Sequence, residues 1–244
     1  MPLRQPFVHD LCGVFAAPIH AWSTTSGAMR GEGAEGLFLA DDRLVRTYAL
    51  KVCGMQLIDG AAAPEELPLG ELSSVGLEPF GAKKLRFTDV VSLEGLPVDP
   101  VVRLVREREA SIDGVRETLT LTSAADHPVA IELEAELGLD GSPMAAVKDP
   151  HLAEKLAVTA PTADLDGNTA KWNWREGTHA TLTVKGEGTS LTASTDETQV
   201  LHAHLSVTLE PNTTASFTWV LTATDEHAPF TGVDQPELGS GITL

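Results

Sequence analysis

Apolar and polar residues alternate with a period of two along much of this chain, which is the pattern of a strand with one buried face. The clearest case runs from Val129 to Leu139, where six apolar residues alternate with three glutamates, Glu132, Glu134 and Glu136. A similar alternation in the two preceding segments makes residues 101–139 three consecutive antiparallel strands with a nearly fixed register. The acidic stripe on the third strand is typical of a face that meets solvent.

A two-residue turn is predicted between the first and second of these strands, at Asp113-Gly114. If Ile112 pairs with Val115, the apolar face of the hairpin carries three charged residues, namely Arg106, Arg108 and Glu117. A lone carboxylate is costly to bury, so we expect Glu117 to form an ion pair with Arg108. Such a pair is either a structural clamp or part of a polar pocket, and the first interpretation is favoured.

Further segments carry strand signals and almost none carries helical periodicity. The candidate strands are 11–15, 19–25, 44–52, 72–77, 84–93, 169–175, 179–185, 190–194, 200–209 and 214–224. Residues 24–36 are rich in Gly, Ser and Glu and are predicted to be a mobile surface loop, 61–69 a connector, and 151–156 at most two helical turns. The fold class is therefore all-β, a large antiparallel β-sandwich over residues 1–228, with 229–244 as a linker toward a further domain.

The charge balance excludes several classes of partner. The 244 residues include 35 acidic and 17 basic side chains, for a formal charge of −18, whereas nucleic acids and anionic membranes bind basic surfaces. The sequence has no signal-peptide pattern and no apolar run of membrane-spanning length, so we expect a cytoplasmic protein. We expect Cys12 and Cys53 to be small buried hydrophobic side chains rather than a disulfide or a reactive site.

Three groups of residues are candidates for chemistry. Asp41 is interpreted as a loop aspartate bonded to Arg43 or to backbone amides rather than as a catalytic acid. His202 and His204 share a strand face, a geometry that metals can use, but no Cys or acid stands at ligand spacing, so neither a metal nor a cofactor is predicted. Trp172 and Trp174 also share a strand face and are candidate sugar contacts, with core packing as the favoured alternative.

Two sequence blocks occur in a suggestive order. The first is G-L-F-x-x-D-x-R at Gly36 to Arg43, followed by a hydrophobic strand and the turn at Cys53-Gly54. The second combines R-E-R at 106–108, the Asp113-Gly114 turn, R-E-T-L-T-L-T at 116–122 and the acidic strand. Together they resemble the N-terminal domain of bacterial and archaeal glycogen debranching enzymes of the amylo-α-1,6-glucosidase type, over residues 30–150. The family usually continues with D-F-x-D, of which only Asp140 is present here.

This resemblance implies a β-supersandwich of the galactose-mutarotase-like class, attached to a downstream (α/α)6 barrel that holds the catalytic carboxylates. The domain itself would be non-catalytic, with the barrel and an α-glucan oligosaccharide as its partners. Its fixed polar framework would comprise Asp41, Arg43, Arg106, Arg108 and Glu117. Two alternatives stay open: an independent carbohydrate-binding module that uses the two tryptophans, and a mutarotase-like sugar epimerase, which would need a His and a Glu facing one concave sheet.

Overall fold

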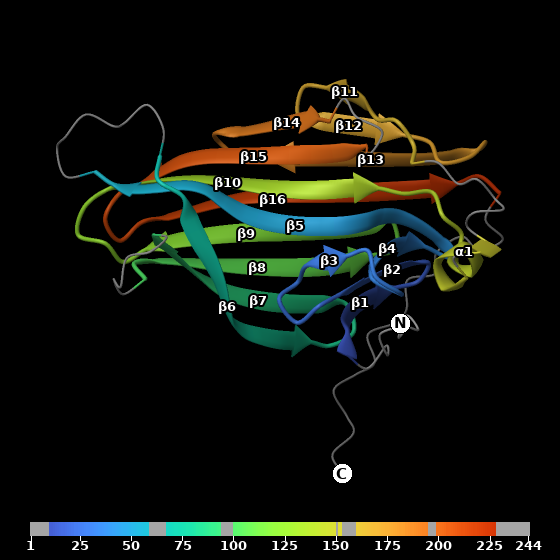
Figure 1. Cartoon of the computed structure of the whole chain (residues 1–244), viewed down its shortest axis with the longest axis horizontal. Helices are drawn as coiled ribbons and strands as arrows, with labels where there is room; N and C mark the ends of the chain where they lie inside the picture. Colours follow the sequence, from blue (N-terminus) through green and yellow to red (C-terminus); the bar gives the residue numbers. More distant parts are fainter. Residues whose placement is uncertain are drawn as a thin grey trace, which may run out of the picture.

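Two antiparallel sheets pack face to face in the computed structural model, with their strands running mainly along the long axis of the molecule (Figure 1). The structure describes residues 10–58, 67–93, 100–149, 151–152, 160–194 and 199–227. The predicted all-β sandwich is confirmed. The predicted linker 229–244 lies outside the described residues, as does most of the 61–69 connector.

Sheet 1 has the strand order β1-β2-β4-β5-β10-β15-β14, and β3 also pairs with β5. Its strands are β1 (Cys12–Ala16), β2 (Ile19–Ser23), β3 (Met29–Arg30), β4 (Gly36–Leu39), β5 (Asp42–Leu57), β10 (Val129–Leu139), β14 (Thr189–Ala193) and β15 (Val200–Leu209). The long strands β5, β10 and β15 form its centre. Figure 1 shows them in front of the second sheet.

Sheet 2 has the order β11-β12-β13-β16-β9-β8-β7-β6. Its strands are β6 (Gly70–Phe80), β7 (Lys84–Leu93), β8 (Val102–Ser111), β9 (Gly114–Ser123), β11 (Asp164–Asp166), β12 (Thr169–Trp172), β13 (Thr178–Lys185) and β16 (Thr214–Asp225). The short helix α1 (Met144–Lys148) follows β10. The sequence placed a helix at 151–156, slightly later, and part of that range lies outside the described residues.

The period-two pattern decides which side chains enter the core. In β10 the six alternating apolar residues that begin with Val129 and end with Leu139 are at most 5 % exposed, whereas the glutamates of the same strand face outward. β9 behaves in the same way, with Val115, Leu119 and Leu121 buried. The inner faces of both sheets form a single hydrophobic core. Within the described residues, no helix has the length and apolar character needed to cross a bilayer.

The third predicted strand of the 101–139 segment belongs to a different sheet from the other two. β8 and β9 form the expected hairpin, but β10 pairs with β5 and β15 of sheet 1 instead of β9. The prediction of three successively paired strands is therefore wrong. Local alternation identifies a strand and its buried face, but it does not show which sheet the strand joins, because both sheets face the same core.

The hairpin register also differs from the expected one by two residues. Ser111 pairs with Gly114, so the turn residues are Ile112 and Asp113. Neither turn residue has a positive φ, and neither does Gly114. Gly114 is instead required by packing. A Cβ atom on it would lie 1.9 Å from the carbonyl oxygen of Leu221 on β16, so only glycine allows this close approach of two strands.

We therefore expect Gly114→Ala to destabilise the sandwich by about 1–3 kcal/mol, because the added methyl group forces β9 and β16 apart. Urea unfolding followed by circular dichroism measures the change. The matched control is Gly76→Ala in β6, whose added methyl group would meet Thr88 Cβ at an ordinary 3.6 Å and should change the unfolding free energy by less than about 0.5 kcal/mol. Equal unfolding free energies for the two variants would contradict the packing explanation.

Candidate functional site

The charged residues predicted on the hairpin face lie in the interior, between the two sheets. Arg106, Arg108 and Glu117 are each at most 2 % exposed. Arg108 Nε donates to Glu117 Oε2 at 2.6 Å, and the two residues are direct partners in the β8–β9 ladder. The expected Arg108–Glu117 ion pair is confirmed. The hydroxyl of Tyr48, on β5 of the other sheet, donates to Glu117 Oε1 at 2.8 Å, a contact that the sequence did not predict.

A second ion pair balances the remaining charge. Arg106 Nε donates to Asp89 Oδ2 at 2.8 Å, and Asp89 is only 1 % exposed. Burial opposes the positive charge of Arg106, but the carboxylates of Glu117 and Asp89 outweigh it and raise the pKa of the guanidinium. The sequence offered one signal for this pair, because Asp89 occupies an apolar-face position of β7 beside Phe87 and Val91. We call these five residues the arginine framework: Tyr48, Asp89, Arg106, Arg108 and Glu117.

The framework also holds the segment that was predicted to be a mobile surface loop. Arg106 Nη2 donates to the carbonyl of Ser26 at 2.5 Å, and Arg108 Nη2 donates to that of Gly27 at 2.8 Å. Gly27 has φ +80°, and a Cβ atom there would lie 2.9 Å from Arg106 Nη1. This part of the 24–36 segment is therefore packed against the core by two buried guanidinium groups, and the prediction of a surface loop is wrong for it.

Arg43, which with backbone amides was one of two kinds of partner expected for Asp41, pairs with Asp140. Arg43 Nε lies 2.5 Å from Asp140 Oδ2, and both side chains are nearly buried. Asp140 Oδ1 accepts hydrogen bonds from the backbone amides of Gly141 and Ser142 at 2.8 and 3.0 Å. Asp41 is exposed. Spacing along the chain does not distinguish the two adjacent aspartates, and Asp42 is the buried one of the two.

Asp42 ties the start of β5 to the opposite sheet. Its Oδ2 accepts a hydrogen bond from Trp174 Nε1 at 3.1 Å and lies 2.6 Å from Arg175 Nη1. Arg175 also forms an ion pair with Asp225 at the end of β16. These contacts, like the Arg43–Asp140 pair, fix the end of the sandwich near α1.

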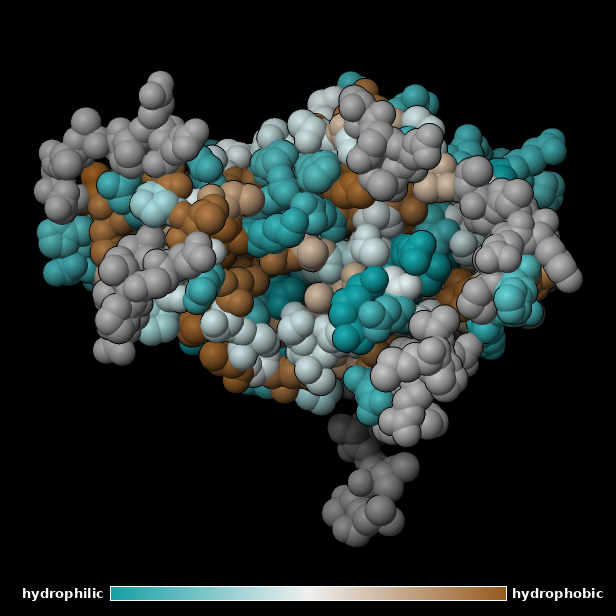
Figure 2. Space-filling view, in the orientation of Figure 1, coloured by the Kyte–Doolittle hydropathy of each residue, from teal (hydrophilic) through white to brown (hydrophobic). Residues whose placement is uncertain are grey.

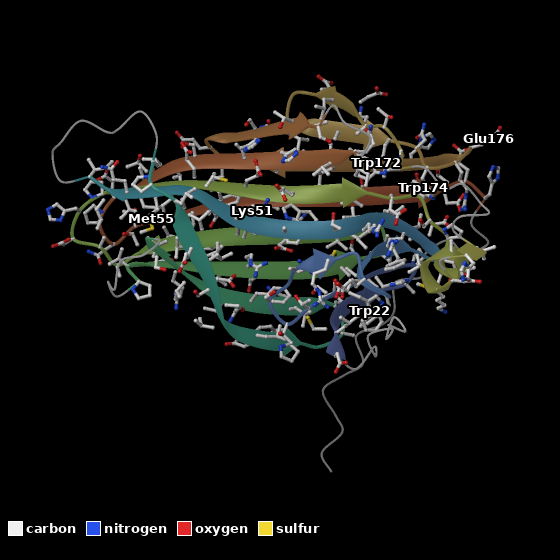
Figure 3. The ribbon with its side chains drawn as sticks, in the orientation of Figure 1. Trp22, Lys51, Met55, Trp172, Trp174 and Glu176 are labelled. Atoms are coloured by element: carbon white, nitrogen blue, oxygen red, sulfur yellow. The ribbon has the colours of Figure 1, made fainter. Side chains whose placement is uncertain are left out.

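The two candidate tryptophans do not form an exposed pair. Trp172 is 3 % exposed and belongs to the hydrophobic core, so a sugar ring cannot stack on it in this conformation. Trp174 follows the end of β12, is partly buried, and has its indole N–H bound to Asp42 (labelled in Figure 3). The favoured alternative, core packing, applies to Trp172, and only Trp174 retains an accessible edge.

A second polar group lies on the outer face of sheet 1. Glu134 and Glu136 of β10 stand opposite His204 and His202 of β15. Carboxylate oxygens of Glu134 lie 3.5 Å from His202 Nδ1 and 3.2 Å from His204 Nδ1. Lys51 of β5 donates to Glu136 Oε1 at 2.5 Å and lowers the pKa of that carboxyl group. We call these five residues the outer-face cluster.

This cluster is accessible, unlike the arginine framework. The side chain of Glu134 is 17 % exposed and that of His204 is 41 % exposed. Figure 3 labels Lys51 on β5, and Figure 2 shows hydrophilic atoms over this part of the sheet. The sequence failed to find an acid near the two histidines because it is supplied by the neighbouring strand, far away in the chain. The glutamates that were interpreted as a solvated stripe are those acids.

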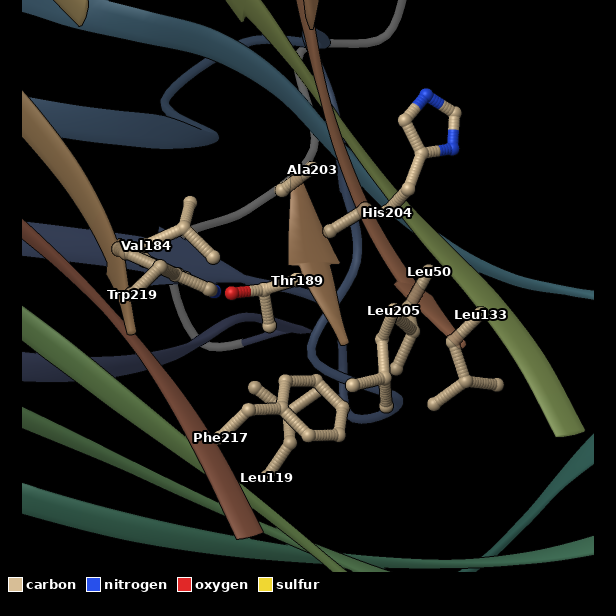
Figure 4. A pocket seen from close by; sticks show the side chains of 11 residues that line it. Leu50, Leu119, Leu133, Val184, Thr189, Ala203, His204, Leu205, Phe217 and Trp219 are labelled. Atoms are coloured by element: carbon tan, nitrogen blue, oxygen red, sulfur yellow. The ribbon is translucent and has the colours of Figure 1, made fainter. Parts of the chain in front are cut away.

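Among the described residues, the space between the sheets beneath this cluster contains no cavity large enough for a ligand. A void of about 10 Å³ lies there, lined mainly by apolar side chains such as Leu119, Leu133 and Trp219 (Figure 4). That volume is at the lower limit for one water molecule, and an apolar lining disfavours even that. The imidazole ring of His204 points away from the void, toward the outer face (Figure 4). Any chemistry on β15 therefore concerns the outer surface.

We expect Glu117→Gln to destabilise the protein by about 3–5 kcal/mol, because it leaves the buried guanidinium of Arg108 without its carboxylate partner. The control is Glu107→Gln on the same hairpin. Glu107 pairs with Arg86 at 2.9 Å, but these side chains are 30 % and 37 % exposed, so its loss should cost less than about 1 kcal/mol. Urea unfolding measures the free energy of unfolding of both variants. Similar decreases for the two variants would show that the buried pair contributes no more to stability than the exposed one.

Comparisons with known proteins agree with this architecture. The chain resembles a putative aldose 1-epimerase from Escherichia coli K12, with 10% identity, a TM-score of 0.57 and coverage of 88% of this chain and 99% of that one. It also resembles a protein from Synechocystis sp. PCC 6803, with 9% identity, a TM-score of 0.58 and coverage of 88% and 96%. A third similar structure is a galactose mutarotase-like protein from Clostridium acetobutylicum, with 9% identity, a TM-score of 0.54 and coverage of 86% of this chain and 94% of that one. These likenesses confirm the predicted galactose-mutarotase-like fold.

Sequence comparison identifies the family more narrowly than the fold does. No protein of curated function matches the sequence. The family model for the N-terminal domain of some glycogen debranching enzymes, however, matches residues 15–220, which include both sheets almost completely. The chain therefore belongs to the family of N-terminal domains found in some glycogen debranching enzymes.

Proposed function

We propose that this chain is the non-catalytic N-terminal domain of a cytoplasmic glycoside hydrolase of the amylo-α-1,6-glucosidase type. In this proposal it packs on a downstream (α/α)6 catalytic barrel and helps to shape the α-glucan cleft of that barrel. The observation that carries the proposal is the family match over residues 15–220. Cys12 and Cys53 are free thiols, which agrees with a reducing compartment.

The state of the interior carboxylates supports a non-catalytic role. Glycoside hydrolysis requires two carboxyl groups on either side of the bond, in contact with the sugar. Asp89 and Glu117 are buried at 1 % and 0 % exposure, and Asp140 at 6 %. Each is paired with an arginine, so each stabilises the sandwich and is withheld from substrate. The catalytic acids are accordingly assigned to the downstream barrel.

Contact with the glucan is a smaller part of the proposal. Trp174 and Arg175 lie at the end of the sandwich that the Asp42 contacts hold in place. Trp174 is the one aromatic residue of the predicted pair that can still offer a ring edge to a sugar. An independent carbohydrate-binding module is less favoured, because Trp172 belongs to the core.

The chain on its own is expected to release no glucose from an α-1,6-branched limit dextrin, because its interior acids cannot reach a glycosidic bond. Glucose release is measured by a coupled enzymatic assay over many hours. A Glu134→Gln variant serves as control for contaminating activity. Glucose release by the parent chain that disappears in Glu134→Gln would contradict the proposal and identify a hydrolase in this domain.

The same proposal makes a prediction about the gene that encodes this chain. Its reading frame past the codon for Leu244 is expected to encode a helical domain with paired acidic residues. A stop codon at that point would remove the partner on which the supporting role depends.

One observation favours a second candidate function, that of a sugar epimerase. Mutarotation of an aldose opens the sugar ring. It needs a general base that removes the proton of the anomeric hydroxyl group and a general acid that protonates the ring oxygen. The outer-face cluster contains an imidazole and a carboxylate, with His204 Nδ1 3.2 Å from Glu134, and one protein of similar fold is described as a putative aldose 1-epimerase. This candidate ranks second because the two groups bond to each other.

The epimerase candidate predicts that the chain accelerates the interconversion of α- and β-D-glucose, and that His204→Gln abolishes the acceleration, because Gln cannot transfer a proton. Polarimetry of freshly dissolved α-D-glucose measures the rate. Under the supporting-domain proposal the rate should equal that of buffer alone, and His179→Gln, an exposed histidine on β13, is the matched control. Acceleration that His204→Gln leaves intact would remove this candidate.

A further inference from the structure

Three side chains of the outer-face cluster bring metal-ligand atoms together. Ligand atoms of Glu134, Glu136 and His202 all lie within 4.8 Å of one another. They come from two neighbouring strands near the centre of sheet 1 and are partly buried, with His202 25 % and Glu136 27 % exposed. Adjacent paired strands hold their Cα positions closely, so the three side chains need to change only their torsion angles to surround one ion.

We propose that the outer-face cluster is a binding site for a divalent transition-metal ion such as Zn²⁺, with Glu134, Glu136 and His202 as ligands. One imidazole and two carboxylates suit Zn²⁺, whereas Mg²⁺ and Ca²⁺ take oxygen ligands. Three protein ligands leave a fourth position for water or an external ligand. The site does not rest on the proposed role of the domain and would be present with or without a catalytic partner.

The distances fit this assignment after a small adjustment. Bonds of about 2.0–2.2 Å in a tetrahedral zinc site separate the ligand atoms by about 3.3–3.6 Å. Because the ligand atoms already lie within 4.8 Å of one another, side-chain rotations that bring them closer by at most about 1.5 Å suffice. The exposure of the cluster gives an ion direct access from solvent.

The local charge favours a cation. Glu134 and Glu136 place two carboxylates side by side on one strand face, and Lys51 supplies a single positive charge. Lys51 bonds to Glu136 Oε1, so the other oxygen of that carboxylate is available as a ligand. A divalent ion would relieve the repulsion between the two acids more completely than one exposed lysine does. The net charge of −18 further favours cation binding.

His204 has a different part in this arrangement. Its Nδ1 lies 3.2 Å from Glu134 Oε2, whereas His202 Nδ1 lies 3.5 Å from Glu134 Oε1. A donor on the far oxygen of a ligating carboxylate fixes its orientation, and loss of such a donor typically weakens metal binding. We therefore assign His204 as a positioning residue.

Isothermal titration of the chelator-treated chain with ZnCl₂ tests the site. One ion should bind per chain, and Glu136→Gln and His202→Gln should each weaken binding at least tenfold. Two variants outside the site are matched controls and should bind as the parent does: Glu132→Gln on the same strand face and His179→Gln on β13. Far-ultraviolet circular dichroism of every variant separates loss of binding from loss of fold.

Cobalt substitution gives a second and independent measurement. Co²⁺ in a four-coordinate site shows strong visible absorption, which His202→Gln should abolish. His204→Phe should weaken Zn²⁺ binding about tenfold, whereas His204→Gln, which can still donate to Glu134, should recover most of the affinity. A merely structural role for His204 would make both substitutions equivalent.

The outcomes that overturn the proposal are equally definite. Absence of saturable binding of Zn²⁺ and Co²⁺ at millimolar concentration would do so. Binding that is unchanged in both Glu136→Gln and His202→Gln would also do so, because the ion would then lie elsewhere on the chain.

Discussion

The ion pair between Arg108 and Glu117 is the interaction on which the packing of the two sheets depends. It places opposite charges at 2.6 Å in an interior from which water is excluded. Desolvation of two ions is expensive, and further donors and acceptors that contact each group help to offset it here. Tyr48 satisfies Glu117 from the opposite sheet, a backbone carbonyl satisfies Arg108, and the ring of Phe87 lies 5.2 Å from the guanidinium.

Sequence reasoning recovered the fold class because alternation is a local signal. In β10 and β9 every apolar position assigned to the core is buried. Glu117, the carboxylate on the same face of β9, forms the expected ion pair with Arg108. The same reasoning failed for strand pairing, which depends on parts of the chain that are distant in sequence. Nothing within residues 101–139 distinguishes a strand that continues one sheet from a strand that crosses to the other. Gly114 was interpreted as a turn residue because its real constraint, the carbonyl of Leu221, lies on another strand.

The sites show the same division. Arg43 was noticed in the first motif block and Asp140 just after the second, but their pairing depends on the β5–β10 contact. The two histidines of β15 were identified as a geometry that metals can use and were then set aside for want of an acid. Glu134 and Glu136 were visible as a stripe, and only the β10–β15 register places them opposite the histidines. Residue types and faces were predictable, and cross-strand neighbours were not.

The position of β10 has a consequence for the order in which the chain can fold. Its two partners, β5 and β15, flank it from distant parts of the sequence, so sheet 1 closes only after long chain loops have been ordered. The β8–β9 hairpin, by contrast, is local and can form early. Arg108 and Glu117 are partners within that hairpin, so their charges meet while water still surrounds them. Sheet 1, closing later, would then bury a pair that is already neutralised, which would lower the electrostatic cost of closing the sandwich.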